Sequence, residues 1–321
     1  MFGMKYGVIG AGAMGYRYGV MLQENAGAEV DFIDTWEPNV EKVREQGGVS
    51  VARDHQNRRV IPINIYYPEE YQGKPDVWII FKKQMQLEDE LKRDAAAGLF
   101  HKGQYVFSAM NGMGHFEKIV KYFSAEKILC GTAMIATRLD GPANVDFMGA
   151  KGTEQMHISQ YAGGKPTTAT QQVIADFKAA SLGPIFVEDY LGMCMSKVVF
   201  NAVVNTLCTM FEVQMGQFIE YEGVPKMAEQ LFNEAYDACE RAGIHLIETR
   251  QEEIDSVTTI SHEYKYHYPS MYQDFSKGRS TEVDYINGYI AKIGREHDYV
   301  CRTHEFVTQQ VHLAELMRKY H

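Results

Sequence analysis

The sequence predicts an α/β domain with a mostly parallel sheet, followed by an all-helical domain. Three observations predict this: a glycine-rich motif between an apolar strand and a helix, further apolar strands that alternate with helical segments, and long helical patterns after Asp189. The chain has 321 residues, enough for two domains of ordinary size. We therefore expect a first domain over residues 1–188 and a second over residues 189–321.

The first domain opens on a strand, a glycine turn, a helix and a second strand, the order of a Rossmann-type dinucleotide-binding unit. These elements are predicted at residues 6–9, Gly10-Ala11-Gly12-Ala13-Met14-Gly15, 16–25 and 29–33. Later strands are predicted at residues 76–81, 105–109, 127–131, 153–161 and 184–187, with an amphipathic helix at 168–181 and a small antiparallel insertion within 47–67. Apolar strands that alternate with helices predict a parallel sheet covered on both faces.

The second domain is predicted to consist of helices at residues 192–211, 225–242, 249–261, 282–297 and 302–320. The first of them overlaps the longest nearly uncharged run, residues 193–211. Because Lys197, Asn201 and Asn205 lie within that run, a buried helix of a soluble protein is favoured over a membrane span.

Composition narrows the classes of partner and the compartment. The 32 Lys and Arg against 42 Asp and Glu give a net charge of −10, so no global positive field attracts nucleic acid or an anionic membrane. The five cysteines are widely spaced without a Cys-x-x-Cys pair, which is typical of reduced thiols. No secretion signal is recognised at the N-terminus, and we expect a cytoplasmic protein.

The glycine motif predicts a binding site for the pyrophosphate of a dinucleotide. Gly10 allows the tight turn, Gly12 lets the backbone approach the pyrophosphate, and Gly15 permits close helix packing. Asp34 ends the second strand, where a carboxylate accepts hydrogen bonds from the adenosine ribose and repels a 2′-phosphate. Since no Arg or Lys follows until Lys42, NAD is favoured over NADP. The alternatives are a structural glycine turn and a carboxylate that serves only its own loop.

Lys197, Asn201 and Asn205 are spaced i, i+4, i+8 and so form one polar stripe on an otherwise apolar helix. Burying these groups is costly unless each has a partner, and a substrate site supplies such partners. An ammonium in a partly apolar site has a lowered pKa, which suits it to deliver a proton near neutral pH. The alternative is a buried ion pair with capped amides.

Several motifs, in order along the whole chain, resemble the ketopantoate reductases and the related D-2-hydroxyacid dehydrogenases, which include the D-mandelate dehydrogenases. Besides the glycine motif they are Lys83-Gln84-Met85-Gln86, Ala109-Met110-Asn111-Gly112-Met113-Gly114, Ser196-Lys197-x-x-x-Asn201-x-x-x-Asn205, Ser270-Met271-Tyr272-Gln273-Asp274 and Thr281-Glu282-Val283-Asp284-Tyr285-Ile286-Asn287-Gly288.

The resemblance implies that Lys197 is the general acid that protonates the keto oxygen as hydride arrives from the cofactor. It implies that the 2-oxo acid is held by Asn201, Asn205 and Ser270, and that Asn111 sits where cofactor and substrate meet. It also implies that the cofactor is contacted by three further residues, Lys83, Thr137 and Glu282.

The residues alone leave simpler roles open for several of these positions. Asn111 and Lys83 each follow a predicted strand at the carboxyl edge of the sheet, where ligands bind. The simpler role for Asn111 is to form a turn, and the simpler role for Lys83 is that of a solvated cation. Ser270 and Glu282 are expected in a polar loop and at the start of the next helix, where they could serve as caps. Two departures from the family pattern matter: Asp34-Thr35 replaces a basic residue, and His297-Asp298-Tyr299 replaces the usual His-Gly.

We therefore predict an NAD-dependent oxidoreductase that interconverts 2-oxo acids and D-2-hydroxy acids with a bulky aromatic or branched side chain. The alternative enzyme is a ketopantoate reductase (2-dehydropantoate 2-reductase), and a non-catalytic NAD-binding protein is a third hypothesis. No metal site is predicted, because His262 and His267 lack the spacing of helical ligands. The partners expected are a small 2-oxo acid and a second copy of the chain in a homodimer, without nucleic acid or membrane.

Overall fold

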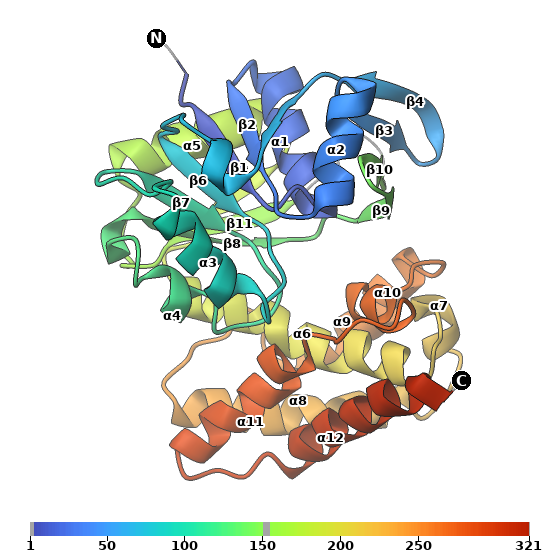
Figure 1. Ribbon diagram of the computed structural model, residues 1–321. Helices are drawn as coiled ribbons and strands as arrows, with labels where there is room; N and C mark the ends of the chain where they lie inside the picture. Colours follow the sequence, from blue (N-terminus) through green and yellow to red (C-terminus); the bar gives the residue numbers. More distant parts are fainter. Residues whose placement is uncertain (1–2, 150–154, 321) are drawn as a thin grey trace. The chain divides into compact units, whose positions relative to one another are not determined.

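The computed structural model describes residues 3–149 and 155–320 of the chain (Figure 1). The chain divides into two compact units, and each unit consists of two separate stretches of sequence. One unit comprises Met1–Met110 and His115–Tyr190, and the other comprises Asn111–Gly114 and Leu191–His321. The short segment Asn111–Gly114 therefore belongs to the second unit. The single domain boundary predicted after residue 188 places this segment in the first domain instead.

The first unit is built on an eight-stranded sheet in the order β12-β11-β8-β7-β6-β1-β2-β5. Its strands are β1 (Tyr6–Ile9), β2 (Val30–Ile33), β5 (Asn64–Tyr66), β6 (Val77–Ile80), β7 (Tyr105–Ser108), β8 (Ile128–Ala133), β11 (Met156–Gln160) and β12 (Pro184–Phe186). All neighbouring pairs are parallel except β11 with β8, which is antiparallel. The sheet is thus mostly parallel, as predicted. The start of the strand predicted at 153–161 lies outside the described residues.

A second, four-stranded sheet has the order β4-β3-β10-β9. It consists of β3 (Val49–Arg53), β4 (Gln56–Ile61), β9 (Thr137–Gly141) and β10 (Asn144–Phe147). The insertion predicted within residues 47–67 supplies the antiparallel pair β3 and β4, but its last strand, β5, joins the large sheet parallel to β2. The hairpin β9–β10 was not predicted, because its strands are short and partly polar and their burial comes from pairing with β3, distant in sequence.

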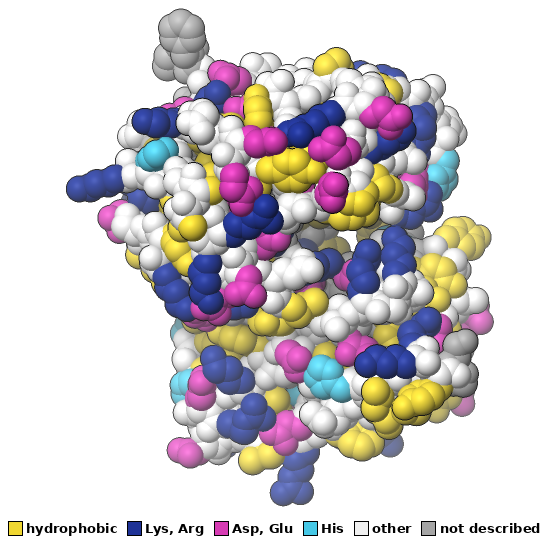
Figure 2. Space-filling model, viewed as in Figure 1, with side chains coloured by type: hydrophobic (Ala, Val, Ile, Leu, Met, Phe, Trp, Pro, Cys, Tyr) yellow, Lys and Arg dark blue, Asp and Glu magenta, His cyan; other side chains and the backbone are white. Residues whose placement is uncertain are grey.

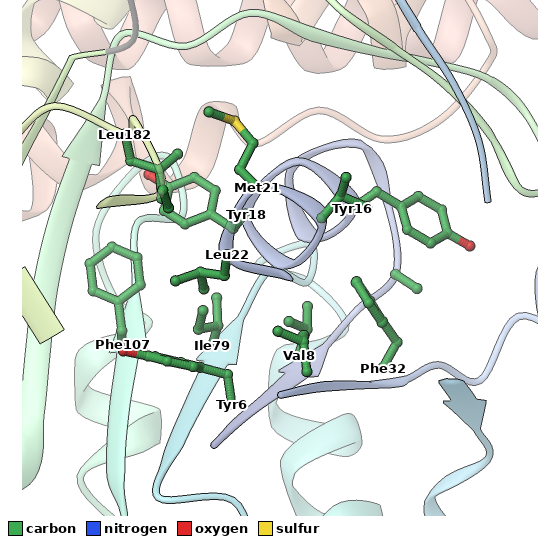
Figure 3. Close-up of a cluster of buried hydrophobic side chains, with 14 of the residues drawn as sticks. Tyr6, Val8, Tyr16, Tyr18, Met21, Leu22, Phe32, Ile79, Phe107 and Leu182 are labelled. Atoms are coloured by element: carbon green, nitrogen blue, oxygen red, sulfur yellow. The ribbon is translucent and has the colours of Figure 1, made fainter. Parts of the chain in front are cut away.

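Helices cover the large sheet, and α1 packs at the centre of the core shown in Figure 3. The helices of this unit are α1 (Ala13–Ala26), α2 (Glu37–Gln46), α3 (Leu87–Ala96), α4 (Phe116–Ile119) and α5 (Thr168–Ala179), with 3-10 turns at Pro68–Glu70 and Ala125–Lys127. Tyr18 of α1 lies against Phe107 of β7, with ring centroids 5.8 Å apart, and Phe107 meets Phe177 of α5 edge to face. Because β1 and β6 are buried at every position, they read as continuous apolar runs.

The second unit is helical. Its elements are α6 (Tyr190–Met210), α7 (Met215–Phe218), α8 (Val224–Arg241), α9 (Arg250–Glu263), α10 (Ser270–Phe275), α11 (Asn287–Glu296) and α12 (Arg302–Met317), with 3-10 turns at Val283–Tyr285 and Arg318–Tyr320. Figure 1 shows α8, α11 and α12 packed side by side. The helix predicted at 282–297 is interrupted at Ile286, whose φ of −117° and ψ of −91° are not helical.

Helix α6 is the core helix of this unit. It is long and apolar enough to cross a membrane by length and composition, but 83% of its most apolar window is buried inside the protein. Its polar groups are satisfied by neighbours: Thr206 donates to Asn287 of α11 at 2.7 Å, and Asn287 donates to the carbonyl of Ala202 at 2.9 Å. The five cysteines, all among the described residues, are buried and carry reduced thiols.

Candidate functional site

The glycine turn between β1 and α1 leaves an open backbone surface at the start of the helix. Gly10 has a φ of +95°, and a Cβ there would lie 2.2 Å from the carbonyl oxygen of Phe81. A Cβ at Gly15 would lie 1.9 Å from the oxygen of Gly10, whereas one at Gly12 would meet nothing within 4 Å. Close packing therefore requires glycine at positions 10 and 15, whereas Gly12 faces space that a ligand can fill.

The helix start fits a phosphate group. Helix α1 begins at Ala13 with Gly12 as its N-cap, so that the N–H groups of its first turn have no partner within the helix. These donors and the helix dipole favour an anion at this end. Asn39 of α2 holds the turn in place by donating to the carbonyl of Ala11 at 3.0 Å. The residues present thus fit the pyrophosphate of a dinucleotide.

Asp34 organises the turn that follows β2. Its Oδ1 accepts hydrogen bonds from the backbone N–H groups of Thr35 and Trp36 at 2.8 and 3.3 Å. Its Oδ2 accepts one from Asn39 Nδ2 at 3.0 Å, which leaves a second lone pair of that oxygen for a ribose hydroxyl. The carboxylate therefore serves its own loop, the simpler role considered above, and retains capacity for a ligand.

A cation lies beside Asp34, although none occurs in the turn that follows β2. Lys82 Nζ is 3.4 Å from Asp34 Oδ1, 3.3 Å from Thr35 Oγ1 and 3.4 Å from Glu90 Oε2. Lys82 follows β6, which β1 separates from β2 in the sheet, so its side chain reaches across β1 to Asp34.

Two other predicted cofactor residues also belong to the first unit. Lys83 follows Lys82 and is partly exposed. Thr137 begins β9 and is partly exposed, but its hydroxyl oxygen is buried and has no hydrogen-bond partner among the described residues. The remaining two, Asn111 and Glu282, belong to the second unit, where Glu282 is buried just before a 3-10 turn.

In the second unit, two of the predicted substrate residues contact Ser270. Asn205 on α6 and Asn111 both donate through Nδ2 to Ser270 Oγ, at 3.4 and 3.3 Å. Ser270 opens the short helix α10, which was predicted as a loop. The segment that carries Asn111 is fixed by the hydrogen bond from Met113 N to Tyr285 O at 2.9 Å.

Lys197 and Asn201 lie on the same stripe of α6 as Asn205, about two turns and one turn, respectively, towards its N-terminus. Asn201 and Asn205 are buried, and Lys197 is partly exposed. Desolvation by burial lowers the pKa of Lys197 to about 8. The preceding residue, Ser196, anchors the helix by accepting a hydrogen bond from Ile247 N at 2.8 Å.

This constellation combines an ammonium that can exchange a proton near neutral pH with amide and hydroxyl donors suited to a small carboxylate. Within residues 3–149 and 155–320, no group of three or more His, Cys, Asp or Glu side chains is placed to hold a metal ion.

Comparison with known proteins matches both units. The family model "Ketopantoate reductase PanE/ApbA" matches residues 6–163, and its C-terminal counterpart matches residues 189–315. The chain is 30% identical to 2-dehydropantoate 2-reductase from Lactococcus lactis subsp. lactis, over 98% of this chain and 99% of that protein. It is 29% identical to the enzyme of the same name from Streptococcus pyogenes serotype M3, over 96% and 97%.

Among solved structures, the chain is similar to D-mandelate dehydrogenase in its ternary structure with NADH and anilino(oxo)acetate. The TM-score is 0.89 and the sequence identity 30%, covering 97% of this chain and 98% of that one.

Proposed function

The chain belongs to the ketopantoate reductase family, and on that premise we propose that it is an NADH-dependent reductase of 2-oxo acids. One observation carries the proposal. Lys197, with a pKa lowered to about 8, shares a helix stripe with Asn201 and Asn205, and Asn205 donates a hydrogen bond to the hydroxyl of Ser270. A proton donor and carboxylate-binding donors are the two requirements for protonating the oxygen of a 2-oxo acid.

Lys197 is proposed to hold the proton that passes to the keto oxygen, and to take it back in the oxidative direction. Asn201, Asn205 and Ser270 are proposed to bind and orient the substrate carboxylate, with Asn111 completing the set. The nicotinamide cofactor, when bound, supplies the hydride. Its pyrophosphate is proposed to rest on the N–H groups at the start of α1.

NAD(H) rather than NADP(H) is proposed as the cofactor. Asp34 directly follows β2 and has a lone pair available on Oδ2, and a carboxylate at this position accepts from a ribose hydroxyl and repels a 2′-phosphate. The similarity to a dehydrogenase whose structure holds NADH supports the same cofactor.

Two substrates are proposed for the reaction. 2-Dehydropantoate is the first, because the curated relatives at 30% and 29% identity are 2-dehydropantoate 2-reductases. A 2-oxo acid with an aromatic or branched side chain is the second, because D-mandelate dehydrogenase is equally similar in sequence and Asp34 replaces the basic residue of the biosynthetic pattern.

Steady-state assays with NADH and NADPH on 2-dehydropantoate, phenylglyoxylate and 2-oxoisocaproate separate these readings. Activity confined to 2-dehydropantoate identifies the biosynthetic reductase, and broad activity identifies a D-2-hydroxyacid dehydrogenase. Binding of NADH without turnover of any of the three would refute the enzymatic proposal.

We also propose a homodimer. Helix α12 and the turn after it expose apolar side chains at helical spacing: Phe306, Leu313, Met317 and Tyr320. Figure 2 shows hydrophobic side chains gathered near the C-terminal end of α12. A second copy that presents the same stripe would bury both, as in a two-fold interface.

A further inference from the structure

We propose that Glu90 sets the preference for NAD(H) by withholding the charge of Lys82 from a ribose 2′-phosphate. The inference rests on the proposed use of a nicotinamide dinucleotide, and it adds a specificity residue on α3, outside the turn after β2. Glu90 acts through Lys82 and is therefore a positioning residue.

Glu90 contacts two residues that lie next to Asp34, namely Thr35 and Lys82. Glu90 Oε1 accepts a hydrogen bond from Thr35 Oγ1 at 2.8 Å, and Glu90 Oε2 lies 3.4 Å from Lys82 Nζ. Thr35 is the residue after Asp34. Lys82 also passes over the glycine turn, since a Cβ at Gly10 would lie 3.2 Å from Lys82 Cδ. The ammonium of Lys82 is thus held beside the carboxylate that faces the ribose.

The cluster is shielded from water. The side chains of Lys82, Asp34 and Glu90 are 9%, 8% and 17% exposed. Charges that are this well buried interact more strongly than surface charges and are less screened by salt. Glu90 and Asp34 carry two negative charges against the single positive charge of Lys82, so the cluster has a net charge of −1. A 2′-phosphate brings further negative charge and is repelled.

Asp94 reinforces this balance from one helical turn beyond Glu90. It is buried, and neither carboxyl oxygen has a hydrogen-bond partner within the part of the chain that the structure describes. Burial raises its pKa to about 7, so it is partly ionised near neutral pH and adds negative charge behind the cluster. The remaining charged group that faces Asp94 on the same helix is Arg93, which forms a salt bridge with Glu69.

Glu90→Gln tests the mechanism with little change in shape. The glutamine keeps an oxygen that accepts from Thr35, but its amide carries no charge to pair with Lys82. The net charge of the cluster rises from −1 to zero, and Lys82 becomes free to meet a 2′-phosphate. We expect the ratio of NADPH affinity to NADH affinity to increase by about tenfold.

Two further variants make the result specific. Glu88→Gln removes a charge from the same helix, but Glu88 is an exposed partner of Lys92 and Lys121, so the ratio should stay unchanged. In the double variant Glu90→Gln/Lys82→Met the gain should disappear, because Lys82 is the group that meets the phosphate. Glu90→Ala, which deletes the charge by truncation, repeats the test should the glutamine variant fold poorly.

The experiment is a calorimetric titration of each variant with NADH, NADPH and 2′,5′-ADP at fixed pH and ionic strength, so that the readout is binding and not turnover. A higher NADPH-to-NADH ratio and tighter 2′,5′-ADP binding in Glu90→Gln, lost on adding Lys82→Met, is the result expected. The inference would be overturned if Glu90→Gln and Glu88→Gln had the same ratio of NADPH affinity to NADH affinity, or if the gain persisted without Lys82. Binding of NADH by the wild type would then still support the proposed function. A wild-type protein that binds neither dinucleotide would overturn both.

Discussion

Ser270 accepts a hydrogen bond from Asn111 at 3.3 Å, although 159 positions separate the two residues along the chain. Asn205 donates to the same oxygen at 3.4 Å. A serine hydroxyl has two acceptor lone pairs and one O–H donor, so the two amides occupy both lone pairs. The remaining O–H of Ser270 is therefore oriented as a donor, which suits it to an anionic group such as a substrate carboxylate.

Replacing Ser270 with alanine removes this donor and leaves two amides without their acceptor. We expect the KM for the 2-oxo acid to rise by about tenfold or more, because a hydrogen bond to a charged group typically contributes about 1.5–3 kcal/mol. NADH binding, measured by calorimetry, should not change. Ser276→Ala, in the exposed serine that follows the same helix, is the control. Equal effects of the two substitutions would remove Ser270 from the substrate site.

Lys197→Ala removes the proposed proton donor. The variant should bind NADH normally and lose turnover by a factor of ~100 or more, as general acid catalysis typically contributes 10²–10⁴-fold. Steady-state rates and an NADH titration on the same preparation separate the two effects. Lys292→Ala, an exposed lysine on α11, is a suitable control. Turnover that survives in Lys197→Ala would assign Lys197 to structure alone.

The sequence was sufficient to predict the features that depend on local patterns. The strand Tyr6–Ile9 has the predicted bounds, and the stripe of Lys197, Asn201 and Asn205 lies on one helix as its spacing required. Periodicity and the positional needs of glycine act over a few residues, so one sequence carries them.

Features that depend on contacts between distant segments could not be predicted from the sequence. Nothing local to Lys82 shows that its side chain crosses β1 to Asp34, 48 positions away. The same holds for Asn111, which follows a strand of the first unit but is held by Ser270 and by the carbonyl of Tyr285 through Met113. The break at Ile286 was missed because the helical pattern continues across it, while Asn287 is held by buried hydrogen bonds to α6.

Asp94 predicts an unusual dependence of stability on pH. Its folded-state pKa, raised to about 7 by burial, exceeds the value of about 4 of an unfolded chain. As pH rises through this window the unfolded state releases the proton while the folded state retains it, so this group lowers the free energy of unfolding.

Asp94→Asn should therefore differ from the wild type by less than about 1 kcal/mol near pH 4 and exceed its free energy of unfolding by on the order of 4 kcal/mol at about pH 8, because the pKa shift spans about three units. Urea unfolding at the two pH values measures the difference. Asp89→Asn, in a residue of the same helix whose side chain is 90% exposed, should show no such gain. A gain that is the same at both pH values would point to a cause other than ionisation.

The proposed homodimer predicts that charge on the α12 stripe separates the subunits. Light scattering after size exclusion should give twice the mass of one chain for the wild type, and a single-chain mass for Phe306→Glu/Leu313→Glu. Two carboxylates in an apolar interface cost more free energy than a stripe of this size contributes. Lys226→Glu, on the exposed surface of α8, should remain a dimer. A wild type that is already a single chain contradicts the proposal.

The lowered pKa of Lys197 predicts opposite pH profiles for the two directions of the reaction. Reduction requires the ammonium form, so kcat/KM for the 2-oxo acid should be level at low pH and fall as pH rises through about 8. Oxidation of the 2-hydroxy acid requires the neutral amine, so its kcat/KM should rise over the same range. In Lys197→Arg the guanidinium stays protonated, and the break near this pH should vanish from both profiles. If the arginine variant kept the break, another group would be responsible for it, because this variant has no lysine at position 197 that can titrate near pH 8.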